Sequence, residues 1–99
     1  MITLKQNDTG IGIKAYLSDD KGITKLHNKR VSFFMGNHKI NAQVLDAEKG
    51  EVLVVFNKVH LKDVKLYYTE FKILHEDGRV ESYPSDKSLL VNVIKGNEL

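Results

Sequence analysis

The chain has 99 residues, enough for one domain with a single core and too few for two domains of ordinary size. Apolar residues make up 41% and charged residues 28%, so the chain can bury a core and need not be disordered. Fifteen Lys and Arg against thirteen Asp and Glu give a net charge of +2, which produces no strong electrostatic field. The composition excludes a multidomain enzyme and predicts a domain that folds alone.

No cysteine is present, so neither a disulfide framework nor a thiolate metal site can stabilise the chain. The longest unbroken apolar run, Val52–Phe56, is far shorter than the roughly 18 residues that a membrane-spanning helix needs. The N-terminus lacks the basic and apolar regions of a signal peptide. We therefore expect a soluble protein that is made in the cytoplasm and has no membrane partner.

Alternation of apolar and polar residues is the main structural signal. Ile11, Ile13 and Ala15 are separated by single residues, and a period of two places them on one face of a sheet. Related patterns predict strands at 11–17, 31–35, 40–44, 51–56, 66–76, 79–83 and 88–95. The inward-facing positions form the expected core, which consists mainly of Ile13, Ala15, Val31, Phe33, Val44, Val52, Val54, Phe71, Ile73, Val91 and Val93.

Turn residues separate these strands at short intervals. Gly36-Asn37, Glu48-Lys49-Gly50 and Asp77-Gly78 are each typical of a hairpin turn, and Pro84 ends a strand because proline has no N–H to donate. Turns that recur about every 8 to 12 residues, without a long helical period, indicate an antiparallel sandwich or barrel. We expect a sandwich of about seven to eight strands.

The segment 57–64 interrupts this succession of short strands and turns. Val59, Leu61 and Val64 are spaced so that a single helical turn would close one end of the sandwich. We find no internal repeat or composition shift, so the expected domain covers residues 1–95, and residues 96–99 look like the start of a linker.

Residue types that carry chemistry lack the spacing that chemistry requires. The histidines at 27, 38, 60 and 75 never pair at i, i+2 or i, i+4, the spacings that bring two zinc ligands together. Asp19-Asp20-Lys21-Gly22 lacks the alternating ligands and closing Glu of a calcium loop and indicates a turn. Gly10-Ile11-Gly12 lacks the third glycine of a dinucleotide loop, and no serine lies in a G-x-S-x-G elbow. We predict no catalytic residue, no metal site and no cofactor, hence a protein that is not an enzyme.

Two binding functions compete with a purely structural role. Small β-barrels bind single-stranded nucleic acid through aromatics and lysines, and Phe33-Phe34 and Tyr67-Tyr68 supply aromatics. The lysines are offset by Asp and Glu and form no basic stripe, which argues against a nucleic-acid partner. A carbohydrate-binding adhesion module needs an exposed aromatic platform, which only tyrosine and phenylalanine can supply because tryptophan is absent.

The order and spacing of turn and strand residues along the chain resemble those of a known protein family. The N-terminal part reads Lys5-Gln6-Asn7-Asp8-Thr9-Gly10, then Lys14–Leu17, then Ser18-Asp19-Asp20-Lys21-Gly22. It is followed by Leu26, Val31-x-Phe33-x-Met35, Val44-x-Asp46, Gly50-x-Val52, Tyr67-x-x-Glu70-Phe71, Asp77-Gly78 and Pro84. Over nearly its whole length the chain resembles the N-terminal domain of phage baseplate upper proteins.

This resemblance implies an immunoglobulin-like β-sandwich that helps attach a host-recognition assembly to a phage tail. The implied partners are other phage tail or baseplate proteins, with a homo-oligomer possible in the full-length protein. The implied location is the virion tail or baseplate, after synthesis in the bacterial cytoplasm. No catalytic residue belongs to the family, so none is transferred to this chain.

The sheet face opposite the core is the expected interface. It carries five large apolar or aromatic side chains, more than a solvated face usually carries: Tyr16, Phe34, Leu53, Val55 and Tyr68. The alternative is that segment 57–64 or a chain end folds over these residues as a second small core.

Overall fold

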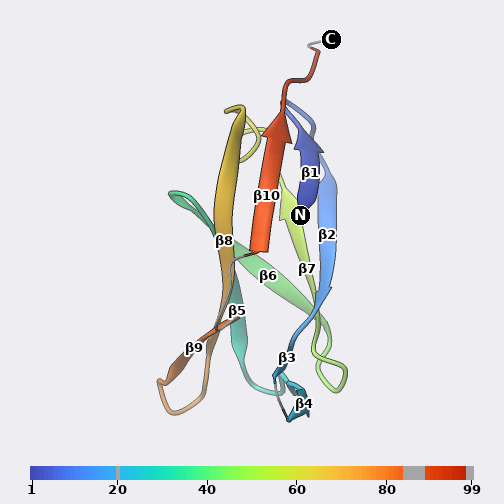
Figure 1. Cartoon of the computed structure of the whole chain (residues 1–99). Coiled ribbons are helices and arrows are strands. Elements are labelled where there is room, and N and C mark those ends of the chain that lie inside the picture. Colours follow the sequence, from blue (N-terminus) through green and yellow to red (C-terminus); the bar gives the residue numbers. More distant parts are fainter. Residues whose placement is uncertain (20, 84–88, 98–99) are drawn as a thin grey trace.

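The computed structural model describes residues 1–19, 21–83 and 89–97 (Figure 1). Strands dominate these residues, and none of them lies in a helix. The strands are β1 (Ile2–Lys5), β2 (Ile11–Tyr16), β3 (Ser18–Asp19), β4 (Gly22–Ile23), β5 (Arg30–Met35), β6 (His38–Asp46), β7 (Glu51–Phe56), β8 (Lys65–Leu74), β9 (Val80–Tyr83) and β10 (Leu89–Ile94). The predicted all-β class is confirmed, and within the described residues no helix is long and apolar enough to cross a membrane.

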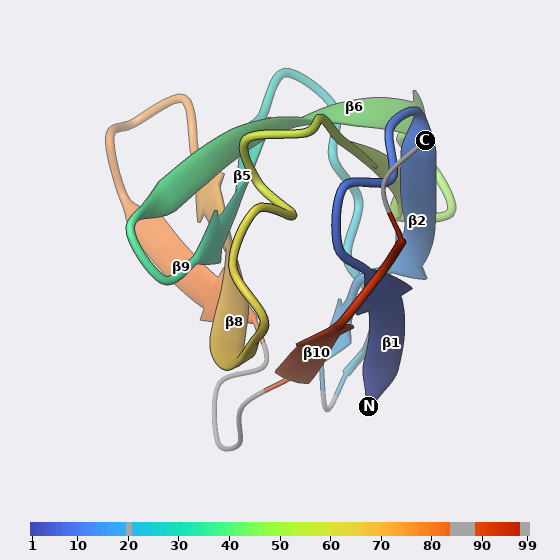
Figure 2. The same ribbon diagram turned by 90° about the horizontal axis from the view of Figure 1, so that it is seen from above.

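One curled sheet contains eight of the strands. Its order is β1-β10-β8-β5-β6-β7-β2, with β9 paired to β8 beyond the end of β10. Strand β6 bends the sheet, because its first part pairs with β5, its later part pairs with β7, and the register shifts between Val44 and Asp46. The sheet curls until its outermost strands, β1 and β2, lie near each other (Figures 1 and 2). The short strands β3 and β4 form a separate hairpin.

The expectation of a wholly antiparallel fold is wrong at one pair. Strand β1 runs parallel to β10, with Ile2 opposite Val91 and Leu4 opposite Val93. This pairing adds Leu4 to the inner face beside the buried Val91 and Val93. Turn signals report only hairpins between neighbouring strands, so they give no sign of a pairing between the two ends of the chain.

The core lies inside the curl. Of the predicted core residues, Ile13, Ala15 and Val44 are partly buried against it, and the remainder are buried. Phe33 is at the centre, with ring centroids 4.9 Å from Phe71 and 6.0 Å from Phe56. The predicted core omitted further buried residues from turns, chain ends and strand termini: Leu4, Leu17, Leu26, Met35, Ile40, Phe56, Tyr67 and Tyr83. Leu61 is also buried, as expected of a residue that closes the end of the sandwich.

The three predicted hairpins all form, joining β5 to β6, β6 to β7, and β8 to β9. Gly50 in the second hairpin has φ +65 and lies so close to other backbone that an added Cβ would be 2.6 Å from the Thr24 carbonyl oxygen. Only glycine fits both conditions. Pro84 and Ser88, predicted to end and to begin a strand, lie outside the described residues.

The segment 57–64 contains hydrogen-bonded turns instead of the expected helical turn. The Asn57 side-chain oxygen accepts a hydrogen bond from the Val59 N–H at 3.0 Å, which holds the chain in a side-chain-capped turn. Leu61 is fully buried, whereas Val59 and Val64 are exposed. One residue of the three therefore closes the end of the core.

Candidate functional site

The five predicted interface residues all lie on strands, at the alternate positions that face outward from the sheet. Tyr68 is 71% exposed, Tyr16 61% and Val55 49%. Phe34 and Leu53 are half-buried. The alternation of strand side chains explains these positions, since each residue neighbours a buried one such as Phe33, Val54 or Tyr67.

The structure divides these five residues into two groups. The first, here called the β2–β7 patch, consists of Tyr16, Leu53 and Val55. In the β2–β7 pair, Glu51 of β7 lies opposite Tyr16, and Gly12 of β2 lies opposite Val55. An added Cβ on Gly12 would be 3.1 Å from Leu53 Cδ1, so the absence of a side chain there lets Leu53 lie across β2.

The second group, the β5–β8 patch, consists of Phe34 and Tyr68. Both line a shallow hollow together with Gly36, Thr69 and Glu70. Tyr68 lies opposite Leu90 of β10, a partly buried apolar residue that extends the patch. The outer face of β6, with the exposed Lys39, Asn41 and Gln43, separates this patch from the β2–β7 patch. The predicted single interface is therefore two smaller surfaces.

Electrostatics distinguish the two patches. In the β2–β7 patch the Tyr16 hydroxyl donates a hydrogen bond to Glu51 Oε2 at 2.5 Å. This bond, followed by the charges of Glu51 and Asp46, raises the pKa of Tyr16 above its usual value of 10.0. In the β5–β8 patch the Lys72 ammonium lies 5.8 Å from the centre of the Phe34 ring. The β2–β7 patch therefore has a carboxylate at Tyr16, whereas the β5–β8 patch has both the Lys72 ammonium and the Glu70 carboxylate beside it.

A groove next to the β5–β8 patch is the feature that the sequence reasoning missed. It has a volume of about 580 Å³, and its lining comes from β5, β6, β8, β9 and the residue before β5. The lining residues are Lys29, Arg30, Val31, Ser32, Phe34, Lys39, Asn41, Ala42, Val44, Lys72, Leu74 and Val80. The four basic residues of this described lining come from three separate parts of the sequence, 29–30, 39 and 72, which is why no basic stripe was evident. Alternation of outward positions on β5, β6 and β8 is the signal that could have revealed it.

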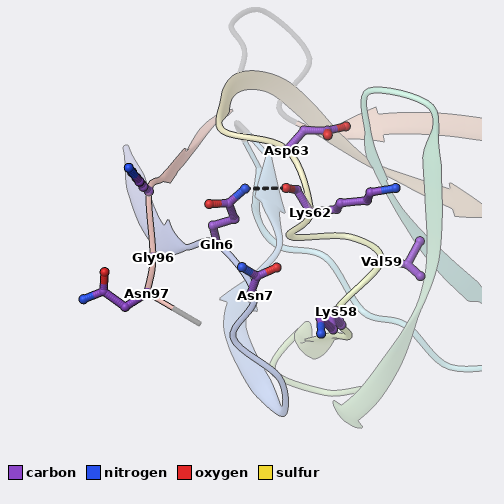
Figure 3. Close-up of a pocket in the computed structure, with 9 residues that line it drawn as sticks. Gln6, Asn7, Lys58, Val59, Lys62, Asp63, Gly96 and Asn97 are labelled. Carbon is purple, nitrogen blue, oxygen red and sulfur yellow. Dashed lines mark hydrogen bonds between the residues drawn. The ribbon is translucent and has the colours of Figure 1, made fainter. Parts of the chain in front are cut away.

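A second hollow, of about 730 Å³, lies at one end of the sheet (Figure 3). The Gln6 side-chain amide donates a hydrogen bond to the Lys62 carbonyl oxygen at 2.8 Å, linking the end of β1 to segment 57–64. Gly96 packs against the backbone of Gln6, where an added Cβ would overlap the carbonyl oxygen. These contacts join the end of β1, segment 57–64 and the residues after β10. The hollow lies where these three segments pack together, so we assign it no binding role.

Two histidines that are far apart in the sequence meet in the fold. The ring centroids of His38 and His60 are 5.2 Å apart. Burial, and then the proximity of His38, lowers the pKa of His60 below its usual 6.5. His60 Nδ1 accepts a hydrogen bond from the Asn57 N–H at 3.1 Å, which requires an unprotonated Nδ1. Within residues 1–19, 21–83 and 89–97, no three His, Cys, Asp or Glu residues form a group able to hold a metal ion.

Asp19, in the segment that the sequence analysis interprets as a turn, makes a hydrogen bond typical of a turn. Asp19 Oδ1 accepts a hydrogen bond from the Lys21 N–H at 2.8 Å, while Asp20 lies outside the described residues. In the β8–β9 turn, hydrogen bonds from Arg79 lower the pKa of Asp77. Both carboxylates accept hydrogen bonds from residues of their own turns.

Comparison of the chain with protein-family models and with curated proteins yields no match in either case.

Proposed function

We propose that this chain is a non-catalytic structural domain of a phage virion that attaches a baseplate or host-recognition assembly to the tail. Its work in this proposal is association with other tail or baseplate proteins. The observation that carries the proposal is the pair of separate apolar patches on the outer face of a small sheet. Patches of this kind are typical of protein–protein contact surfaces.

The positions of the family-like landmarks support the phage assignment. Asp8-Thr9-Gly10 forms the connection between β1 and β2, and Asp77-Gly78 lies in the β8–β9 turn. In Tyr67-x-x-Glu70-Phe71 the two aromatic residues are buried and Glu70 lies on the outer face. These landmarks, apart from Glu70, thus occupy turns or core positions, which is where a family pattern would constrain the sequence.

We also propose that the curled sheet is a variant of the immunoglobulin-like sandwich. The β1-β10-β8-β5 half and the β7-β2 half enclose the same core, and β6 pairs with strands of both halves. A strand that changes from one sheet to the other at a bulge is a known way to build the corner of a sandwich.

The proposal expects the neighbouring genes to encode tail proteins. It is tested by mixing the purified chain with the products of those genes and measuring complex mass by light scattering. We expect a defined complex that is lost in Tyr68→Ala or in Tyr16→Ala. A control change, Lys21→Ala, alters an exposed residue that belongs to neither patch and should leave the complex intact. Binding to a glycan array or to oligonucleotides, with no binding to any tail protein, would contradict the proposal.

A further inference from the structure

The groove between β5, β6 and β8 has a charge distribution unlike that of the whole chain. The chain has nearly balanced charges, 15 basic and 13 acidic. Among the residues that the structure describes, the groove lining includes Lys29, Arg30, Lys39 and Lys72 but no Asp or Glu. A cleft that collects charges of one sign strengthens the local potential and attracts ligands of the opposite sign.

Three of these cations lie at successive levels along β5. Lys39 is opposite Phe34, Lys72 is opposite Ser32, and Arg30 begins the same outward row. Because a strand rises about 3.3 Å per residue, successive outward levels are separated by about 7 Å. An extended peptide repeats its side chains on one face with the same spacing. Lys39 and Lys72 lie on β6 and β8, the strands on either side of β5. Their long side chains can therefore reach, from both sides, an extended segment that lies along β5 with acidic residues at alternate positions.

Apolar side chains form much of the remaining lining. Phe34, Leu74 and Val80 reach the groove from β5, β8 and β9. Leu74 and Val80 are opposite each other in the β8–β9 pair and are 42% and 56% exposed. An apolar lining lowers the local dielectric constant, so that ion pairs formed there are stronger than on an open surface.

The same features favour a peptide over a single-stranded nucleic acid. Nucleic-acid grooves stack bases on exposed aromatic faces. Phe34 is the single aromatic residue of the groove, it is half-buried, and the Lys72 ammonium lies near its ring at 5.8 Å. No aromatic platform for successive bases is present among the groove residues that the structure describes.

We propose that this groove binds an extended acidic segment of a partner protein, whose carboxylates pair with Arg30, Lys39 and Lys72. The inference goes beyond the phage role and requires only the groove. Glu70 borders the groove and forms a 3.6 Å ion pair with Lys72, both side chains being partly exposed. It competes weakly for Lys72, so its removal should strengthen peptide binding.

Fluorescence anisotropy tests the proposal with a labelled peptide that alternates Glu and Thr, a Gln-for-Glu version, and labelled oligothymidylate. We expect the full chain to bind the Glu peptide at least about tenfold more tightly than the Gln peptide. Binding should weaken on raising salt to about 0.3 M, where screening shortens the range of the ionic attraction.

Variants locate the binding to this groove. The double variant Arg30→Glu/Lys39→Glu should weaken peptide binding at least about tenfold, whereas Glu70→Gln should strengthen it about two- to fivefold. The matched control Lys14→Glu/Lys49→Glu makes the same change of net charge at exposed positions outside the groove and should bind like the wild type. Circular dichroism checks that each variant is folded, and Arg30→Gln/Lys39→Gln replaces the reversal variant if that one unfolds.

Several results would overturn the inference. They are no binding of the Glu peptide by the wild type, equal binding of the Gln peptide, equal weakening by the control variant, and weaker binding by Glu70→Gln. Tighter binding of oligothymidylate than of the Glu peptide would assign the groove to nucleic acid instead.

Discussion

The inner and outer faces of the sheet differ most clearly at two pairs of neighbouring aromatic residues. Phe33 is fully buried and Phe34 half-buried, while Tyr67 is 5% exposed and Tyr68 71%. The members of each pair are chemically identical and differ only in strand phase. The inner member therefore stabilises the fold, whereas the outer member is available for contacts outside the chain.

Replacing the inner phenylalanine should give the largest effect. Phe33→Ala removes a ring that packs against both Phe56 and Phe71 at the centre of the core. We expect a loss of about 3 to 5 kcal/mol in the free energy of unfolding, measured by chemical denaturation. The matched outer change, Phe34→Ala, should cost about 1 kcal/mol or less, because the ring is only half-buried. Equal losses in the two variants would show that the two faces are assigned wrongly.

Two turn glycines extend the comparison from side chains to backbone. Gly50 is buried with φ +65, and Gly10 is exposed with φ +71. Gly50→Ala should cost at least about 2 kcal/mol, because its Cβ would also overlap the Leu17 and Thr24 carbonyl oxygens. Gly10→Ala meets no atom within 4 Å and should cost about 1 kcal/mol, from backbone strain alone. The denaturation midpoints of the two variants show how much the steric overlap adds to the backbone strain. A smaller loss of stability for Gly50→Ala than for Gly10→Ala would contradict the close packing of the Gly50 turn.

Protonation of His60, at the edge of the core, should have a smaller effect on stability than these substitutions. Burial first, then His38, lowers the pKa of His60 in the fold, so below about pH 6.5 the unfolded chain binds the proton more readily. Stability should therefore fall as the pH is lowered through 6.5 and level off below the folded pKa. Thermal melts of the wild type and of His60→Gln between pH 7.5 and 5 measure this contribution as a difference.

The exposed His27 supplies the control for that measurement. It pairs with Glu48 on the surface, and His27→Gln keeps the environment of His60 unchanged. His27→Gln should therefore retain the acid-dependent loss that His60→Gln reduces. A pH profile unaffected by His60→Gln would mean that protonation of this ring is not coupled to folding.

The parts of the fold that could be predicted from the sequence are those governed by local chemistry. Strand phase follows from alternation within a few residues, and the hairpin at Gly50 follows from its need for positive φ. The parallel β1–β10 pair depends on residues that are distant in sequence, and so does the burial of Leu61 alone among Val59, Leu61 and Val64. Local patterns contain no information about which distant segment will cover a given side chain.

The same distinction applies to the candidate site. Alternation correctly predicted that Tyr16, Val55 and Tyr68 face outward. It did not predict that β6 separates the two patches, because strand order is a property of the whole sheet. The basic groove was missed for the same reason, since Arg30 and Lys72 become neighbours only when β5 pairs with β8.

The smallest expected effect on stability belongs to the outer tyrosines, and it decides whether the outer face is an interface. Tyr68→Ala should change the free energy of unfolding by less than about 0.5 kcal/mol, because the side chain is 71% exposed. Tyr68→Ala should nevertheless abolish binding to the proposed tail partner if the β5–β8 patch is the contact, since aromatic anchors dominate interface energies. Tyr16→Ala makes the equivalent change in the β2–β7 patch, so the variant that loses binding identifies the patch in use. If Tyr68→Ala instead melts several degrees lower and still binds, Tyr68 belongs to a second small core, and the attachment surface lies in the loops or chain ends.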